Sequence, residues 1–162
     1  MESKKETQVS NSYLTIKLGQ EEFGVHVNQV LNILEMTSIT EVPKSPSYMK
    51  GVINLRGTAL PIIDLRMKFG MPEEAYTDKT CIVVMDLQQN EETIYIGAIV
   101  DEVISVTDIT NEQIEPAPNM GTSYEAEFIT GMAKVNDEFI MLVDMQLVLS
   151  EEELSVYADE AH

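Results

Sequence analysis

The fold is decided by the stretch GVINLRGTALPIIDL, which covers residues 51–65. Two apolar runs, at residues 52–55 and 59–65, flank the pair Arg56-Gly57. Short β-branched runs on either side of a glycine-containing turn are typical of a β-hairpin. The sequence therefore predicts a hairpin whose tip carries Arg56, one of only two arginines in the chain.

The same plan returns as GMAKVNDEFIMLVDM at residues 131–145, where Asn136-Asp137 takes the place of the first turn. Glycine and aspartate stand thirteen positions apart in both stretches. Residues 97–103 also repeat the glycine and valine spacing of residues 24–30. Any two hairpins alternate apolar residues, but the shared order of these blocks favours an internal repeat.

The repeat predicts a mainly β chain with two similar lobes, at about residues 13–70 and 80–149, each a small curled sheet. The polar residues 1–11 are expected to form a flexible tail, and residues 150–162 an acidic tail. The chain has 162 residues, of which 44% are hydrophobic, so the lobes have enough apolar side chains to share a core.

Periodicity locates the remaining elements. Apolar residues recur at helical spacing over residues 27–34 and predict a short amphipathic helix. Helical turns are expected to follow the two hairpins, at residues 65–69 and 146–149. Further strands are expected at residues 13–18, 23–25, 39–42, 81–87 and 93–100.

The formal charge of −18 is unevenly distributed. Residues 1–79 hold ten acids and nine bases, whereas residues 80–162 hold eighteen acids and a single base, Lys134. Such a chain repels phosphate backbones and anionic lipid, which argues against nucleic acid as a partner. The acidic half fits either a partner with a basic face or a surface that only keeps the protein in solution.

Compartment and redox state follow from what the sequence lacks. No apolar run reaches the ~18 residues of a membrane helix, and the N-terminus has no apolar signal segment, so we expect a cytoplasmic protein without membrane insertion. The single cysteine, Cys81, excludes an internal disulfide and is expected to be buried as a small apolar side chain. The ten methionines, including Met85 and Met141, are expected mainly in the core.

Residues that usually carry catalysis are few. The sequence has no glycine-rich phosphate loop, and it has only two histidines. Asp64, Asp101 and Asp144 each follow or interrupt an apolar strand. A carboxylate at the end of a buried strand commonly accepts backbone hydrogen bonds or caps the next turn. We therefore expect structural roles for these aspartates, and neither catalysis nor a bound metal or cofactor.

Arg56 is the strongest candidate for a binding residue. Arginine is enriched at binding hot spots because its guanidinium group pairs in a bidentate way while its stem packs. A solvated arginine at the surface is the simpler alternative. If Arg56 does bind, it either contacts a partner directly or braces a groove through internal hydrogen bonds, and we favour a combination of the two.

Several stretches of this sequence belong together as a family pattern. The most specific are NLRG at residues 54–57 and PIIDLR at residues 61–66. Over roughly residues 12–149, these motifs resemble the CheW family of bacterial chemotaxis coupling proteins. Supporting stretches are residues 13–24, KFG at 68–70, VDEV at 100–103, IEPAP at 114–118 and ITG at 129–131.

The resemblance implies two five-stranded SH3-like β-barrel lobes that share a hydrophobic core. It also implies a non-catalytic adaptor without cofactor, which couples the cytoplasmic tips of methyl-accepting chemoreceptors to the histidine kinase CheA. The kinase's regulatory domain is itself CheW-like, and such adaptors are recruited from the cytoplasm to membrane-anchored receptor arrays. By resemblance, the receptor-binding positions are Val30, Ile33, Asn54, Arg56 and Ile82, and the kinase-binding positions are Ile39 and Gly51.

The sequence departs from the family pattern at Asn32, Leu34 and Glu41, which lie on or beside the implied contact surface. These departures concern the choice of partner more than the fold. A small-ligand-binding β-barrel module is the competing interpretation, which would need convergent polar groups inside a lobe. An enzyme is the third and weakest one.

Overall fold

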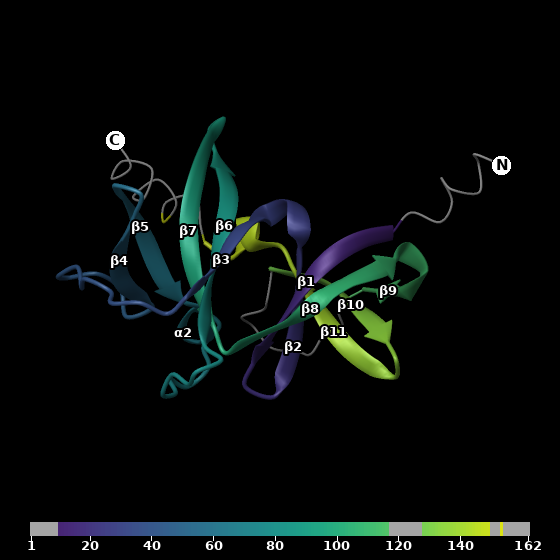
Figure 1. The fold of residues 1–162 in the computed structure, drawn as a ribbon. Helices are drawn as coiled ribbons and strands as arrows, with labels where there is room; N and C mark the ends of the chain where they lie inside the picture. Colours follow the sequence, from purple (N-terminus) through teal and green to yellow (C-terminus); the bar gives the residue numbers. More distant parts are fainter. Residues whose placement is uncertain (1–9, 117–127, 150–152, 154–162) are drawn as a thin grey trace.

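The computed structural model describes residues 10–116, 128–149 and 153. The predicted tails at residues 1–11 and 150–162 lie almost wholly outside this part of the chain. The described residues are mainly β and form two sheets, which confirms the predicted fold class (Figure 1). None of the described helices is long and apolar enough to cross a membrane.

The first sheet has the strand order β8-β1-β2-β11-β10-β9, and the second has the order β3-β6-β7-β5-β4. The strands of the first are β1 (Ser10–Leu18), β2 (Glu21–His26), β8 (Glu102–Thr110), β9 (Ile114–Glu115), β10 (Ile129–Val135) and β11 (Glu138–Val143). Those of the second are β3 (Val30–Glu35), β4 (Met49–Leu55), β5 (Thr58–Asp64), β6 (Cys81–Gln89) and β7 (Glu92–Val100). The two-residue β9 gives the first sheet a sixth strand beyond the expected five.

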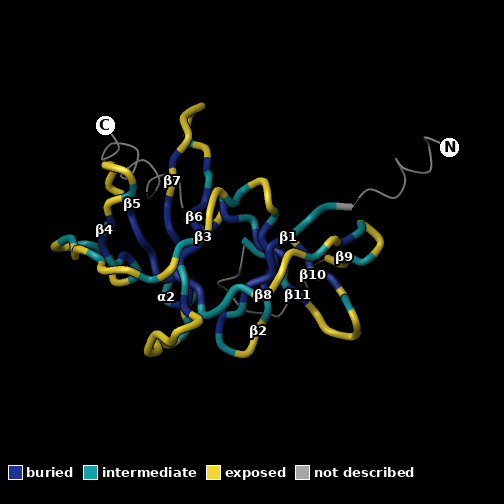
Figure 2. The backbone as a smooth tube through the Cα atoms, in the orientation of Figure 1, coloured by how far each residue is buried: buried dark blue, intermediate teal, exposed yellow. Residues whose placement is uncertain are grey.

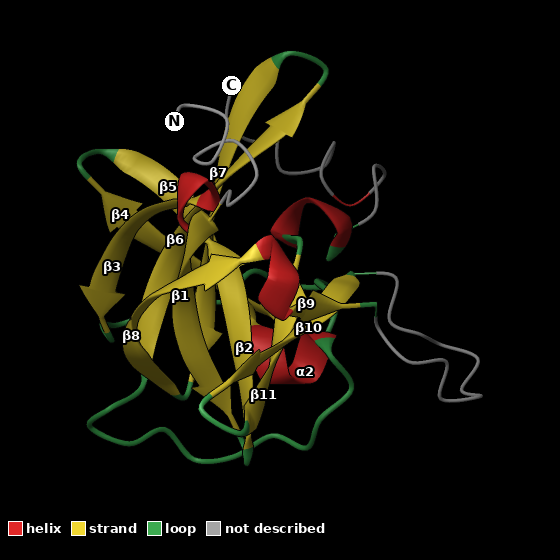
Figure 3. Ribbon diagram, turned by 90° about the vertical axis from the view of Figure 1, so that its right-hand side faces the viewer, coloured by secondary structure: helices red, strands yellow, loops and turns green. Residues whose placement is uncertain are grey.

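The helical segments of the described chain are all short (Figure 3). The predicted turns after the two hairpins are confirmed as α2 (Leu65–Lys68) and η3 (Met145–Leu147), and η2 (Asn111–Gln113) precedes β9. The predicted helix over residues 27–34 is wrong, because only η1 (Val27–Gln29) is helical there and the rest is strand β3. A short apolar pattern fits either structure, and backbone pairing with β6 decides for the strand.

Each sheet contains strands from both halves of the chain. β11 pairs in parallel with β2, and β5 pairs in parallel with β7. The two strand orders correspond position by position. The run β8-β1-β2-β11-β10 of the first sheet matches the run β3-β6-β7-β5-β4 of the second. The predicted lobes at residues 13–70 and 80–149 are therefore halves of the sequence, but each sheet combines strands from both halves. The matching strand orders of the two sheets support the proposal of an internal repeat.

The two hairpins share one register. Gly51 lies opposite Ile62 in the β4–β5 hairpin, Gly131 lies opposite Leu142 in the β10–β11 hairpin, and a register shift precedes each glycine. Over ten residues from each glycine, buried, half-buried and exposed positions follow in the same order (Figure 2). The resemblance between residues 51–65 and 131–145 that the sequence shows thus extends to pairing and burial.

Strands β3 and β8 each contain a β-bulge at the equivalent position. The pairing of β3 with β6 moves from Val30 directly to Asn32, and the pairing of β8 with β1 skips Ile104. The extra residue of a bulge is left out of the ladder and bends the strand. Leu31 and Ile104 are exposed as a result, at 52% and 42%.

Three apolar clusters hold the fold together. The largest lies between the sheets and takes side chains from both, and each fully buried one contributes ~1.5–3 kcal/mol. Leu34 on β3 and Leu55 on β4 both pack against a smaller cluster, although these are the outermost strands of their sheet. The second sheet therefore curls around this cluster, as in an SH3-like lobe. Its buried members are Ile53, Leu60, Ile62, Ile82, Val84 and Ile99; those of the first sheet's own cluster are Ile109, Ala133, Ile140 and Leu142.

A partly buried ion pair fastens the two sheets to each other. Arg66 of α2 is only 6% exposed, and its Nη1 lies 2.7 Å from Oδ2 of Asp101. The same oxygen accepts a hydrogen bond of 2.7 Å from the backbone N–H of Gly19, between β1 and β2. A buried guanidinium group needs such a partner, since an unpaired buried charge is strongly destabilising.

Candidate functional site

Arg56 and Gly57 form the two-residue turn of the β4–β5 hairpin, with φ values of 55° and 85°. Positive φ at both positions is the type I′ geometry whose twist suits a hairpin. Glycine and asparagine adopt it readily, whereas other L-residues are destabilised there by ~1 kcal/mol. Asn136 takes the equivalent position in the β10–β11 hairpin, with a φ of 53°. An arginine at this position is therefore less favourable for folding than the asparagine of the equivalent turn.

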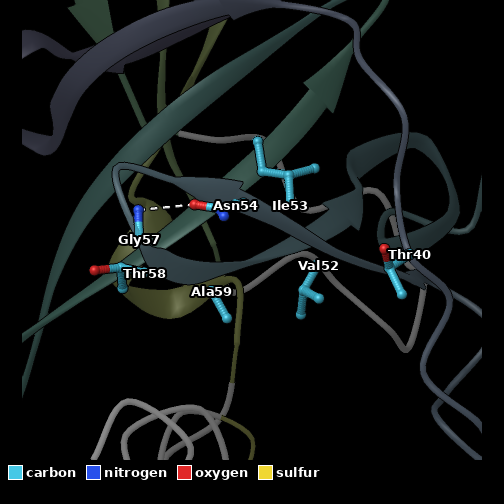
Figure 4. Close-up of a pocket in the computed structure, with 7 residues that line it drawn as sticks. All are labelled: Thr40, Val52, Ile53, Asn54, Gly57, Thr58 and Ala59. Atoms are coloured by element: carbon cyan, nitrogen blue, oxygen red, sulfur yellow. Dashed lines mark hydrogen bonds between the residues drawn. The ribbon is translucent and has the colours of Figure 1, made fainter.

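Asn54 supports the turn from within. Its Oδ1 accepts a hydrogen bond of 2.8 Å from the backbone N–H of Gly57 (Figure 4). Within the described residues, no hydrogen bond or ion pair involves the exposed side chain of Arg56. The bracing that we expected of Arg56 is therefore carried out by Asn54, and Arg56 is presented to solvent.

A shallow pocket of about 280 Å³ lies beside this turn (Figure 4). It combines the hydroxyl-bearing side chains of Thr40 and Thr58 with the small side chain of Ala59. It runs along the β4–β5 hairpin, from the segment after β3 to the turn. The lining residues are Thr40, Val52, Ile53, Asn54, Gly57, Thr58 and Ala59.

Ile39 and Gly51, the two positions expected at the kinase surface, are in contact. Gly51 is buried with a φ of 141°, and a Cβ there would collide with the carbonyl of Thr40 and lie 2.8 Å from Ile39 Cγ2. Thr40 and Val52 exchange two backbone hydrogen bonds of 2.9 Å, the only part of the predicted strand at 39–42 that forms. Gly51 therefore gives space to the crossing segment instead of offering a surface of its own.

The remaining receptor positions lie on β3 and β6. Ile33 is 43% exposed on β3, while Val30 is half-buried against the shared core. Ile82 is 0% exposed, so it supports β3 from beneath through its pair with Leu34 and cannot touch a partner. The expected receptor positions therefore fall into two groups. Asn54 and Arg56 lie at the end of β4 and in its turn, whereas Val30 and Ile33 lie on β3, at the other end of the strand order.

Two of the three departures from the family pattern face solvent. Asn32 and Glu41 are exposed, and Oδ1 of Asn32 accepts a hydrogen bond of 2.8 Å from the N–H of Ile33. Leu34 instead packs against the small cluster of the second sheet. Of the three departures, only Asn32 and Glu41 are therefore exposed at the surface.

The three aspartates have the structural roles that the sequence predicts. Asp64 caps α2 and accepts hydrogen bonds from the N–H of Met67 and, at 3.0 Å, from the hydroxyl of Tyr76. Burial and the carboxylate of Asp64 raise the pKa of Tyr76 well above its usual value. Asp144 caps η3 in the same way, and Asp101 binds Arg66 and a backbone N–H. No group of acids, histidines and cysteines among the described residues could hold a metal ion.

The sequence did not predict one cluster of interacting polar side chains. Tyr48 donates a hydrogen bond to Glu153, and Nζ of Lys68 lies 3.0 Å from the same carboxylate and 4.4 Å from the centre of the Tyr48 ring. The residues are far apart in the sequence, so no spacing indicated the cluster. Cys81 was predicted to be buried but is half-buried, and burial nevertheless raises the pKa of its thiol.

The fold defines a class of protein, a two-lobed β module built from two sheets that share a core. The profile of the CheW-like domain matches residues 12–153, and the chain belongs to this family. The protein is 35% identical to the chemotaxis protein CheW of Klebsiella aerogenes over 91% of this chain and 87% of that one. It is 34% identical to a probable chemotaxis protein CheW of Rhizobium etli, over 90% and 92%.

The similarity extends to a solved structure. The scaffolding protein TtCheW from Thermoanaerobacter tengcongensis superposes with a TM-score of 0.78 and 28% sequence identity. The match covers 90% of this chain and 97% of that one. The two-lobed fold of the family is therefore present here nearly from end to end.

Proposed function

We propose that this protein is a non-catalytic adaptor of bacterial chemotaxis, which couples the cytoplasmic tips of methyl-accepting chemoreceptors to the histidine kinase CheA. Its relatives are named chemotaxis proteins, and its structural neighbour is described as a scaffolding protein. The observation that carries the proposal is Arg56. It is exposed and held at positive φ within the family's NLRG motif, although asparagine in the equivalent turn would fold with less strain.

For the receptor, we propose direct contact through Asn54 and Arg56 at the hairpin tip and through Ile33 and Val30 on β3. Ile82 contributes by holding β3 in place. An exposed apolar side chain next to a half-buried one is suited to a hydrophobic partner, and an arginine adds bidentate hydrogen bonding. Asn32 on the same strand is then a natural determinant of which receptors bind.

For the kinase, we propose the surface around Ile39 and the neighbouring Glu41. Gly51 acts indirectly, because it lets the segment that carries Ile39 cross β4. On this proposal, the protein acts in the cytoplasm, is recruited to membrane-anchored receptor arrays and needs neither a cofactor nor nucleic acid. Receptor and kinase then contact different residues, and simultaneous binding of both is what an adaptor requires.

The competing function, a small-ligand-binding barrel, has less support. Ligand pockets usually enclose ~300–1,000 Å³ and bury most of the ligand. The pocket beside the β4–β5 turn has about 280 Å³ and lies along an exposed hairpin. A thermal shift against a panel of metabolites tests this alternative, and a stabilising metabolite would favour it.

The adaptor proposal is tested by a pull-down from bacterial lysate with this chain as bait and the Arg56→Asn variant as matched control. We expect mass spectrometry to identify a CheA kinase with both baits, and chemoreceptors with the parent chain more than with the variant. Recovery of neither kinase nor receptors with the parent chain would overturn the proposal.

A further inference from the structure

The outer edge of β4 has free pairing capacity next to the β4–β5 turn. In a hairpin with a two-residue turn, the residues that flank the turn form a hydrogen-bonded pair, and bonded and non-bonded pairs then alternate. Leu55 and Thr58 flank this turn, so Asn54 belongs to a non-bonded pair with Ala59. The backbone N–H and C=O of Asn54 therefore point away from β5, as do those of Val52.

Only one of these two residues is paired on that side. Thr40 takes both backbone groups of Val52, with antiparallel hydrogen bonds of 2.9 Å. Among the described residues, none forms a backbone hydrogen bond with Asn54 on this side, and the pocket of about 280 Å³ opens beside it. In this register the residue opposite Asn54 would be Ser38 of the same chain, and the backbone hydrogen bonds of the described residues include none between the two. The position at Asn54 beside the pocket is therefore open to an incoming strand.

The equivalent edge in the first sheet is protected. There, β9 covers two residues of β10, Met132 and Ala133, instead of one. The position equivalent to Asn54 is Lys134, the only base in the second half of the chain. A lysine on an edge strand discourages pairing with another chain. Asn54 carries no charge, so of these two matching edges only the β4 edge is left open to a partner.

The charge beside this edge indicates the kind of strand that fits. Arg56 adjoins Gly57 of the pocket and has no acidic partner among the described residues. A carboxylate on the incoming chain would provide one, and a bidentate pair with arginine adds specificity.

We propose that the β4 edge binds an extended peptide segment of a partner protein, which adds antiparallel to β4 at Asn54 and places an Asp or Glu against Arg56. Main-chain hydrogen bonds give such strand addition its affinity, and side chains in adjoining pockets give its specificity. The inference rests on the proposed adaptor function only for the source of the strand. The edge itself is a property of this chain and is tested without kinase or receptor.

The probe is the capped pentapeptide of sequence ETVTV, titrated into the isotope-labelled full chain and followed by amide chemical shifts. We expect shifts at the amides of Asn54 and Gly57 and none at Lys134. Methylation of the peptide's backbone nitrogens removes the donors for strand pairing, and we expect it to weaken binding at least tenfold. A Gln in place of the peptide's Glu, or Arg56→Asn in the protein, should weaken it severalfold.

The matched variants are Asn54→Lys, which copies the protected edge, and Lys134→Asn, which leaves β4 unchanged. We expect Asn54→Lys to lose peptide binding and Lys134→Asn to keep it. Asn54→Lys also removes the hydrogen bond to the N–H of Gly57, so spectral changes confined to the residues around each substitution show that the variant is folded. The inference is overturned if millimolar peptide leaves the Asn54 amide unmoved, or if methylation or Asn54→Lys has no effect. If kinase and receptor binding persists in such a case, the proposed function stands and only the inference of peptide binding at the β4 edge is lost.

Discussion

The side chain of Asn54 reaches across the turn to the backbone of Gly57, with its Oδ1 accepting the N–H at 2.8 Å. This contact closes the β4–β5 hairpin without help from Arg56, which lies between the two residues. The family's NLRG motif thus contains two different tasks, support by the asparagine and presentation of the arginine. Substitutions can separate these tasks, because the first concerns stability and the second, on the proposed function, concerns binding.

Arg56→Asn should separate binding from folding. Asparagine tolerates positive φ better than arginine, so we expect the free energy of unfolding to stay the same or rise by ~0.5 kcal/mol. Receptor affinity should fall by ~2 kcal/mol, roughly thirtyfold, if Arg56 is a direct contact. Thermal denaturation and calorimetric titration with a receptor fragment measure the two effects. Asn54→Ala is the control, which should lose ~1 kcal/mol of stability with the turn's hydrogen bond. A drop in stability with Arg56→Asn would show that the arginine braces the fold after all.

Two glycines of the same hairpin should respond very differently to alanine. In Gly51→Ala, the new Cβ meets the backbone of Thr40, which cannot move aside without losing its pairing with Val52. We expect a loss of ~3 kcal/mol or more, together with kinase binding, because the segment that carries Ile39 is displaced. In Gly57→Ala, nothing lies within 4 Å of the new Cβ, so only the positive φ costs stability, ~1 kcal/mol. Urea denaturation measures both, and equal losses would contradict this account of Gly51.

The acidic end of the chain offers a test at single-residue resolution. Residues 150–162 are predicted to form an acidic tail, but Glu153 within this stretch contacts Lys68 and Tyr48. A chain that ends at Glu153 should therefore be more stable by ~0.5–1 kcal/mol than a chain that ends at residue 152. The difference should shrink at high salt, since the ion pair is partly exposed. Identical melting curves for the two truncations at low salt would show that the cluster contributes nothing.

Cys81 should react slowly with thiol reagents in the folded protein. Burial, assisted by the carboxylate of Glu102, raises the pKa of its thiol, so the reactive thiolate is scarcer than in a free cysteine at neutral pH. Reaction with a disulfide reagent should be several times slower than in denaturant and should accelerate as the pH rises. A folded-state rate equal to that of the unfolded chain would contradict the protected environment.

The sequence predicts the hairpins well because their signals are local. A glycine-containing turn between β-branched runs needs no distant partner to be recognised, and both hairpins appear at residues 51–65 and 131–145 with one register. The aspartates that end buried strands are local signals too. Asp64 and Asp144 cap the helical turns that follow them, as expected.

What the sequence could not reveal depends on distant pairing. The apolar residues after Val27 fit a helix in isolation, and only the backbone of β6 makes the segment from Val30 onward a strand. The exchange of strands between the halves has the same origin, since β2 and β11 pair across more than half of the chain. Ile82 was placed at the receptor surface by resemblance alone, and its complete burial follows from neighbours on four other strands.

The most direct test of the adaptor proposal is simultaneous occupancy. Purified protein, the CheA regulatory domain and a receptor cytoplasmic fragment should be mixed and their complexes resolved by analytical ultracentrifugation. The account predicts binary complexes with each partner and a ternary complex that contains all three, because different residues are proposed for the kinase (Ile39 and Glu41) and for the receptor (Arg56, Asn54 and Ile33). Competition between kinase and receptor for one surface, or the absence of both binary complexes, would contradict it.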